Sequence, residues 1–242
     1  MNPNIEPSAG LVIQNLSTPR KLSDFKLIAF DMDSTLINIE CVDEIADAAG
    51  RKMEVAALTE AAMRGEITDY KDSLRQRVAL LKGVTVAHME QVYTQRLQLN
   101  PGAEKLVMAC KAAGLKVLLV SGGFTFFTDR IKAQLQIDFS RSNVLGIENG
   151  VLTGQMIDQP WGDICDGYEK RRTLLEVASL MGITPAQCIA MGDGANDLPM
   201  MAACSEAGGL SVAYHAKPKV REQAMVAINS GGLDRLLEVF TN

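Results

Sequence analysis

The sequence predicts an α/β fold: a doubly wound parallel sheet with helices on both faces and a helical cap inserted after the first core strand. Apolar runs without polar alternation are typical of parallel strands buried on both faces, and such runs occupy residues 26–30, 115–120 and 188–191. From residue 101 onward these runs alternate with helical patterns, which indicates a sheet covered on both sides. Residues 40–100 carry helical patterns and no convincing strand, so we expect them to form the inserted cap.

The 242 residues divide into three regions on these patterns. Residues 1–24 are a short lead with one expected strand at 11–13, and they are too few to fold as an independent domain. Residues 25–39 and 101–242 form the α/β core, and residues 40–100 form the cap domain.

Apolar spacing and glycine positions place the individual elements. Leu74, Val78 and Leu81 fall on one helical face, and Gly50 stands where a helix beginning near residue 42 should end. We expect cap helices at 42–49, 54–63, 69–81 and 86–98. We expect core helices at 103–113, 126–135 and 168–181, strands at 209–213 and 224–228, and a hairpin of 144–147 with 151–153 around the Asn149-Gly150 turn.

Composition excludes several classes of protein. Hydrophobic residues make up 47% of the chain, which supports a real core and argues against disorder. The net charge of -5 argues against broad nucleic-acid binding. The five cysteines are scattered without Cys-x-x-Cys spacing, which indicates free thiols in a reducing compartment. No signal peptide and no apolar stretch of about 20 residues is evident, so we expect a cytoplasmic protein without a membrane partner. We also expect a monomer or homodimer with no nucleic-acid partner.

Polar side chains gather where three predicted strands end. Because the carboxyl ends of parallel strands share one edge of a sheet, these side chains are expected to converge there. A carboxylate at such an edge can attack phosphorus, a second can move a proton, and oxygen ligands suit Mg²⁺. Loop capping by Asp and helix capping by Ser are the ordinary alternatives. The three groups are Asp31 and Asp33, Ser121 and Gly122, and Asp193, Asn196 and Asp197.

Four motifs in this order resemble the signature of the haloacid dehalogenase superfamily. They are Asp31-x-Asp33-x-Thr35, Ser121 after an apolar strand, Lys170, and Gly192-Asp193-x-x-x-Asp197. Within that superfamily, residues 31–40, 73–78, 120–124 and 192–197 resemble the phosphoserine phosphatases, and the resemblance runs from about residue 26 to the C-terminus. It implies a core with the superfamily's Rossmann-like sheet.

The resemblance implies a catalytic and metal-binding role for four aspartates. Asp31 is the expected nucleophile, and Asp33 the group that protonates the leaving hydroxyl and later activates water. Mg²⁺ is expected to be held by Asp31, by the backbone carbonyl of Asp33 and by Asp193. Asp197 is expected to orient this metal site.

The remaining matched residues are implied to bind substrate. Glu40 offers a negative charge for an ammonium group, and Arg77 a planar fork for a carboxylate. A first-turn glutamate and a surface arginine are the ordinary alternatives. Packing within the cap is the favoured account of Met63 and Tyr70, with pocket closure as the alternative. The phosphate is expected to be held by Ser121, Gly122, Lys170 and Asn196.

The resemblance therefore implies a Mg²⁺-dependent hydrolase that converts O-phosphoserine into serine and phosphate through an aspartyl phosphate, the last step of serine biosynthesis. A phosphatase or phosphotransferase for another small amine-bearing phosphomonoester remains an alternative, as does a non-enzymatic module that binds a phosphorylated ligand. Cys165 to Arg171 also match the Cys-x5-Arg loop of cysteine-dependent phosphatases, but the acidic residues Asp166 and Glu169 would repel a phosphate there.

Overall fold

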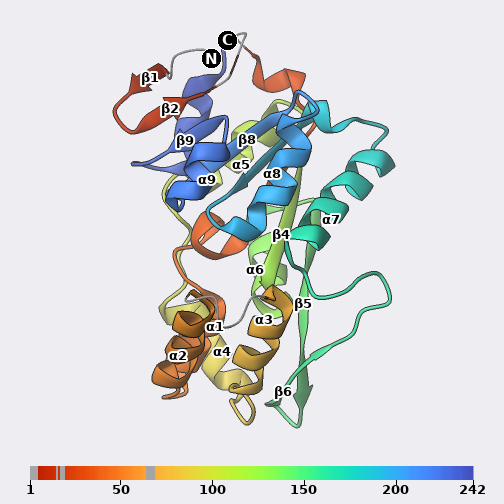
Figure 1. Cartoon of the computed structure of the whole chain (residues 1–242). Coiled ribbons are helices and arrows are strands. Elements are labelled where there is room, and N and C mark those ends of the chain that lie inside the picture. The colour runs from red at the N-terminus through yellow and green to blue at the C-terminus, as the bar shows by residue number, and fades with distance from the viewer. Residues whose placement is uncertain (1–4, 15, 17–19, 64–68, 242) are drawn as a thin grey trace.

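The computed structural model describes residues 5–14, 16, 20–63 and 69–241. In this part of the chain a nine-stranded sheet has the order β1-β2-β9-β8-β7-β3-β4-β5-β6 (Figure 1). The strands are β1 (Ile5–Ser8), β2 (Leu11–Ile13), β3 (Leu27–Phe30), β4 (Lys116–Phe124), β5 (Phe139–Glu148), β6 (Val151–Ile157), β7 (Cys188–Gly192), β8 (Leu210–Tyr214) and β9 (Val226–Ile228).

The centre of the sheet is parallel. β3 lies between β4 and β7, with Ala29 opposite Leu118 on one side and Ala190 on the other. β7, β8 and β9 continue the parallel order. The carboxyl ends of β3, β4 and β7 therefore lie at one edge, with β3 in the middle.

Helices cover both faces of this sheet, as the alternation of side chains along β3 requires. Ile28 and Phe30 belong to the apolar cluster that includes α5 (Ala103–Ala112) and α6 (Thr125–Leu135). Leu27 and Ala29 belong to the opposite cluster, with α7 (Gly167–Leu180) and α8 (Leu198–Ser205). The predicted doubly wound α/β class is confirmed. Shorter helical segments are α9 (Pro218–Gln223) and the 3-10 turns Leu22–Asp24, Pro185–Gln187, Ala195–Asp197 and Leu233–Val239.

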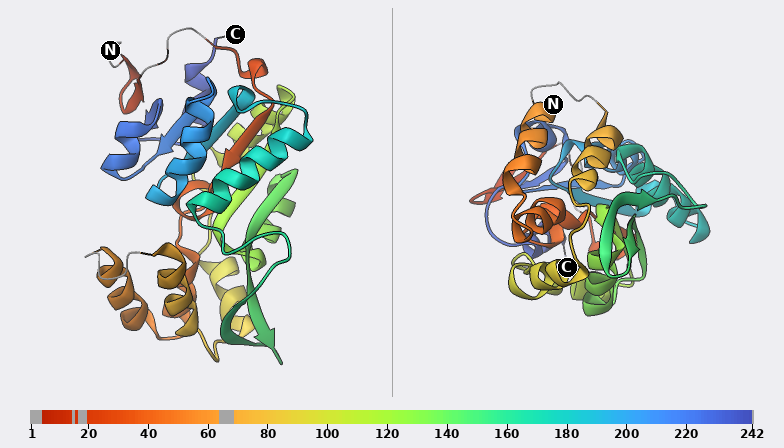
Figure 2. Two further views of the ribbon diagram at one scale, coloured as in Figure 1. Left: turned by 45° about the vertical axis from the view of Figure 1, so that its right-hand side comes forward. Right: turned by 90° about the horizontal axis from the view of Figure 1, so that it is seen from below.

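Four helices between β3 and β4 gather at one end of the molecule, the end opposite the chain termini (Figure 2, left). They are α1 (Cys41–Ala48), α2 (Lys52–Met63), α3 (Tyr70–Ala79) and α4 (Val86–Gln95). α4 ends three residues earlier than expected because the chain turns back toward the core. Asn38 accepts a hydrogen bond from the Gln98 N–H at 2.7 Å, and Ile37 pairs with Leu99 in a β-bridge.

The hairpin of β5 and β6 is longer than expected and reaches the cap. β5 pairs with β4 through residues 139–143 and with β6 through residues 144–148. At the far end the Leu152 N–H donates to the Val84 carbonyl at 2.7 Å, and the Gly83 N–H donates to the Leu152 carbonyl at 2.8 Å. Residues outside 40–100 thus contribute to the cap region, so the sequence boundary marks only the inserted helices.

The N-terminal lead is part of the sheet in its described residues. β2 pairs antiparallel with β9, placing Leu11 opposite Ile228, and β1 pairs with β2 at the edge. Leu11 is fully buried. The lead therefore contributes to the α/β core, although the boundary predicted from the sequence places it outside.

Two further features bear on the expectations from composition. No helix in the described ranges is long and apolar enough to cross a membrane. All five cysteines are free and buried. Burial raises the pKa of Cys110 and of Cys165 to about 12, so these thiols stay protonated at neutral pH.

Candidate active site

A pocket of about 290 Å³ lies where β3, β4 and β7 end and the cap begins. Every predicted site residue except Lys170 and Asp197 lines it, and those two lie buried directly behind Asp31. The predicted residues in its lining are Asp31, Asp33, Glu40, Arg77, Ser121, Gly122, Asp193 and Asn196.

The loop after β3 turns both of its carboxylates toward this pocket. The Asp31 N–H donates to the Met191 carbonyl at 3.0 Å, which ties the first carboxylate to β7. Residues Met32–Leu36 then form one π-type turn, closed by a hydrogen bond from the Ile37 N–H to the Met32 carbonyl at 3.0 Å. Ser34 within it has φ 57°, a left-handed conformation that non-glycine residues seldom adopt.

A buried lysine links two of the aspartates. Lys170, which is fully buried, donates to Asp31 Oδ1 at 2.6 Å and to Asp197 Oδ1 at 2.7 Å. Burial raises the pKa of Asp31, and the charges of Asp197 and Asp193 raise it further, while Lys170 opposes them. Burial alone would lower the pKa of Lys170, but Asp197 and Asp31 hold it above its ordinary value. The lysine therefore stays charged, and its two hydrogen bonds hold Asp31 and Asp197 in position.

Asp33 is suited to exchange a proton near neutral pH. Its Oδ2 accepts a hydrogen bond from the Cys41 N–H at 3.1 Å, and its Oδ1 accepts one from the Cys41 thiol at 3.1 Å. Burial and the nearby charge of Glu40 raise the pKa of Asp33 to about 7, against the lowering effect of Cys41. An acid with such a pKa can both give and take a proton at working pH.

Three carboxylates are close enough to share a cation. Ligand oxygens of Asp31, Asp193 and Asp197 all lie within 4.8 Å of one another. Burial and the charge of Asp197 raise the pKa of Asp193 to about 7, as expected for acidic groups crowded together. An all-oxygen donor set of this kind fits Mg²⁺.

Asp197 is already engaged by other partners. Its Oδ2 accepts the backbone N–H groups of Asp193 at 3.1 Å and Gly194 at 3.0 Å, and its Oδ1 accepts from Lys170. These bonds suit a residue that orients the loop rather than one that binds the ion itself. Among the described residues the Asp193 carboxylate accepts only a long contact from the Thr35 hydroxyl, at 3.4 Å, and keeps oxygens for a ligand.

The end of β4 forms a tight loop against the cap. Ser121 Oγ accepts the Gly123 N–H at 2.8 Å, and the Gly122 carbonyl accepts from Asn143 at 2.8 Å. A Cβ on Gly122 would lie 2.0 Å from the Tyr70 hydroxyl, so a side chain at this position would displace Tyr70. The loop leads directly into α6, whose first N–H groups lack helical partners and can bind an anion.

Two buried polar atoms in the pocket wall have no hydrogen-bond partner among the described residues. They are Arg77 Nε, on α3, and Asp43 Oδ1, on α1. Each such group requires an explanation, because an unpaired buried donor or acceptor is costly. A ligand carrying both a carboxylate and an ammonium would satisfy them. Glu40 lies beside them in the wall, with its Oε1 held by the Ser34 hydroxyl at 2.7 Å.

Sequence reasoning missed several residues of this site. Asp43 and Lys217 line the pocket, and Tyr70, for which we favoured packing, lines it too. Lys217 follows β8, and its N–H donates to the Asp193 carbonyl at 3.2 Å, so the polar residues after a fourth strand were an available signal. The side chain of Met63 lies outside the described residues.

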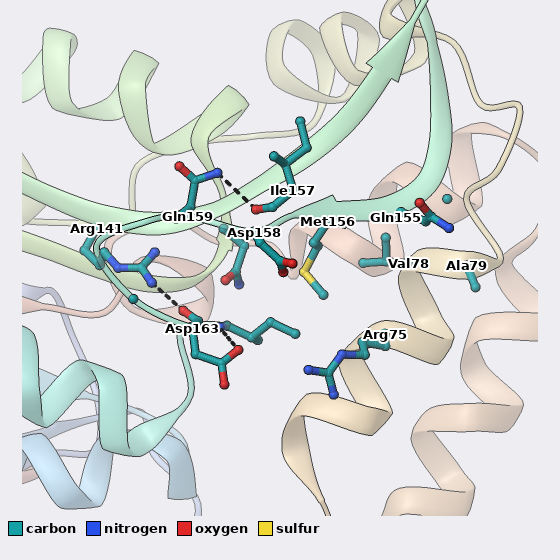
Figure 3. A pocket seen from close by; sticks show the side chains of 14 residues that line it. Arg75, Val78, Ala79, Arg141, Gln155, Met156, Ile157, Asp158, Gln159 and Asp163 are labelled. Atoms are coloured by element: carbon teal, nitrogen blue, oxygen red, sulfur yellow. Dashed lines mark hydrogen bonds between the residues drawn. The ribbon is translucent and has the colours of Figure 1, made fainter.

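A second, larger cavity contains none of the predicted site residues. It measures about 370 Å³ and lies between α3, β6 and the loop at 158–164 (Figure 3). Arg75, Val78, Met156 and Asp163 are among its lining residues. Chemistry rather than size therefore identifies the candidate active site.

Comparisons with known proteins agree with the motifs. A family model described as haloacid dehalogenase-like hydrolase matches residues 25–205. The chain belongs to the haloacid dehalogenase-like hydrolases. The predicted family and the prediction of a hydrolytic enzyme are thereby confirmed.

Similar members of this family carry a common name. The chain is 77% identical, over 97% of its length and 98% of the relative's, to a protein from Polaromonas sp. named phosphoserine phosphatase. A crystal structure of a probable phosphoserine phosphatase from Vibrio cholerae matches with a TM-score of 0.79 at 42% identity, covering 94% of this chain and 67% of that one. A structure titled as a phospho-aspartyl intermediate analogue of phosphoserine phosphatase matches with a TM-score of 0.79 at 36% identity, covering 90% and 99%.

Proposed function

We propose that this protein is a Mg²⁺-dependent phosphoserine phosphatase that acts through an aspartyl phosphate on Asp31. One observation carries the proposal: the nucleophile, with its lysine buried behind it, shares a pocket with an acid–base carboxyl and with the oppositely charged groups Glu40 and Arg77 on the cap side. The names of the relatives support the same substrate. The reaction would be the last step of serine biosynthesis, in a cytoplasmic monomer or homodimer.

Asp31 and Asp33 divide the chemistry of the first half-reaction. Asp31 attacks the phosphorus, the bond from phosphorus to the serine oxygen breaks, and Asp33 gives that oxygen a proton. Lys170 and the Ser121–Gly122 loop bind the phosphate oxygens, with Asn196 beside them. Asp33, now ionised, takes a proton from the water that attacks the aspartyl phosphate, which releases phosphate, restores the Asp31 carboxylate and returns Asp33 to its protonated form.

A divalent ion fits the acidic edge of the pocket. Asp31, Asp193 and the backbone carbonyl of Asp33 would hold Mg²⁺, with Asp197 orienting the Asp193 loop through its two backbone hydrogen bonds. Bound there, Mg²⁺ supplies the positive charge that lets an anionic nucleophile approach an anionic phosphate.

The inserted helices would select the substrate and exclude water. Glu40 would accept the ammonium group and Arg77 would bind the carboxylate in the planar, two-pronged geometry typical of arginine. The cap domain, proposed as residues 40–100, would close over the bound molecule so that the aspartyl phosphate forms away from bulk water.

Phosphate release from a panel of small phosphomonoesters, with Mg²⁺ and with chelator, tests this function. We expect phosphoserine to be preferred, and chelation to lower its turnover more than about ten-fold, because an uncompensated carboxylate repels the phosphate. Metal-dependent release with a preference for another amine-bearing ester would retain the Asp31 chemistry and reject the substrate. No release from any ester would favour a binding module.

An ion pair between the cap and the core gives a further prediction. Lys71, on α3, lies 2.7 Å from Asp163 and 3.5 Å from Asp166, which precedes the helix of Lys170. We expect Lys71→Ala to raise the KM for phosphoserine about three-fold, since it removes a contact made when α3 lies on the core. The free energy of unfolding should change by less than about 1 kcal/mol, as for other exposed pairs.

Steady-state kinetics and urea unfolding check this prediction together. Lys105→Ala is the matched control, because Lys105 pairs with Asp234 at 2.9 Å within the core alone. An unchanged KM in Lys71→Ala, or an equal rise in both variants, would contradict a role for the cap–core contact.

A further inference from the structure

The carboxyl group of Asp33 is held from one side by a single residue. In the described chain both hydrogen bonds to this side chain come from Cys41, one from its backbone N–H and one from its thiol, each at 3.1 Å. Gly123 lies on another side, where a Cβ would be 3.4 Å from Asp33 Oδ2 but where no side chain exists. The orientation of the acid–base group therefore depends on Cys41.

We propose that Cys41 is a positioning residue for Asp33, and that its thiol donor is what fixes the rotation of the reacting carboxyl. The terminal torsion of an aspartate is broad, so one hydrogen bond leaves the carboxyl free to swing about its Cβ–Cγ bond. Two donors, one to each oxygen, define the plane of the group. The remaining lone pairs then face the pocket, where the leaving oxygen and the attacking water must be.

The position of Cys41 in the fold adds to this role. It is fully buried and is the first residue of α1, directly after the chain leaves the core. Its thiol contact joins the first cap helix to a residue on the core loop. A shift of α1 would move both Cys41 donors away from Asp33. The orientation of the Asp33 carboxyl therefore depends on the present position of α1.

A packing role and a donor role of Cys41 predict opposite orders of activity for the serine and alanine variants. If Cys41 only fills apolar space, alanine should be tolerated better than serine, because serine brings a polar group into the core. If the donor matters, Cys41→Ser should keep kcat within about three-fold of the original, while Cys41→Ala should lower kcat about ten-fold with KM within two-fold. A loss of that size is a fraction of the 10²–10⁴-fold that a general acid–base group typically provides.

The experiment is steady-state phosphoserine hydrolysis by both variants, at a temperature where thermal unfolding shows all proteins folded. Cys110→Ala is the matched control, since Cys110 is equally buried, lies on α5 away from the pocket, and should keep its kcat. Equal losses in Cys41→Ser and Cys41→Ala, or an alanine variant as active as the original, would overturn the inference. The inference rests on the proposed function, and an unsubstituted protein that releases no phosphate would instead overturn that function.

Discussion

Asp31→Asn is expected to abolish phosphate release while leaving the protein folded. An amide is a poor nucleophile, and loss of a covalent nucleophile costs hydrolases a factor of about 10⁴ or more in kcat. The fold should survive because the pKa of Asp31 is already raised by burial and by Asp197 and Asp193, so removing its charge relieves repulsion among the three acids. Lys170 keeps its contact with Asp197 at 2.7 Å in the variant. Phosphate release and thermal unfolding measure the two parts of the prediction.

The nucleophile assignment can be separated from a general electrostatic effect. Asp129→Asn makes the same change on the exposed surface of α6 and should leave kcat unaltered. Acid-quenched protein, incubated with phosphoserine and digested, should carry phosphate on the peptide with Asp31 in the original protein and not in Asp31→Asn. Turnover close to normal in Asp31→Asn, or phosphate found on another aspartate, would reject Asp31 as the nucleophile.

The sequence was most informative where local pattern and tertiary role coincide. The uninterrupted apolar run of β3 predicted a strand buried on both faces, and all four of its residues are buried. Polar residues directly after such strands were expected to converge, and the structure brings Asp31, Ser121 and Asp193 into one pocket. That convergence follows from parallel topology alone, because strand ends share an edge.

Other features depend on partners that no local pattern reveals. Leu11 was read within a separate lead, yet β2 completes the sheet by pairing with β9, far away in sequence. The reach of β5 and β6 to the cap depends on Leu152 pairing with Val84, a contact set by the cap's final position. Cys41 was noted only as a scattered cysteine, because nothing in its spacing indicated a bond to Asp33. Asp43 lies in the first turn of α1, where an acidic residue is ordinary, and only its unpaired oxygen in the pocket wall distinguishes it.

Substrate choice should depend on Arg77. We expect Arg77→Ala to lower kcat/KM for phosphoserine about 100-fold, since hydrogen bonds between charged partners contribute about 1.5–3 kcal/mol. Phosphoethanolamine, which lacks the carboxylate, should lose less than about three-fold. The reason is that Arg77 Nε is a buried donor without a partner among the described residues, and a ligand carboxylate would satisfy it. Steady-state kinetics with the two esters measures the ratio directly.

Arg75→Ala is a close control for this change, because it removes the same side chain from the same helix. Arg75 pairs with Asp72 at 3.0 Å and lines the other cavity, so it should not affect either ester. If Arg77→Ala loses equally with both esters, Arg77 supports the cap instead of binding the carboxylate. Selectivity would then rest on Glu40 and Asp43 in the pocket wall, whose carboxylates would recognise the ammonium group alone. Amine-bearing phosphomonoesters would in that case compete with phosphoserine, and the substrate range would be broader than proposed.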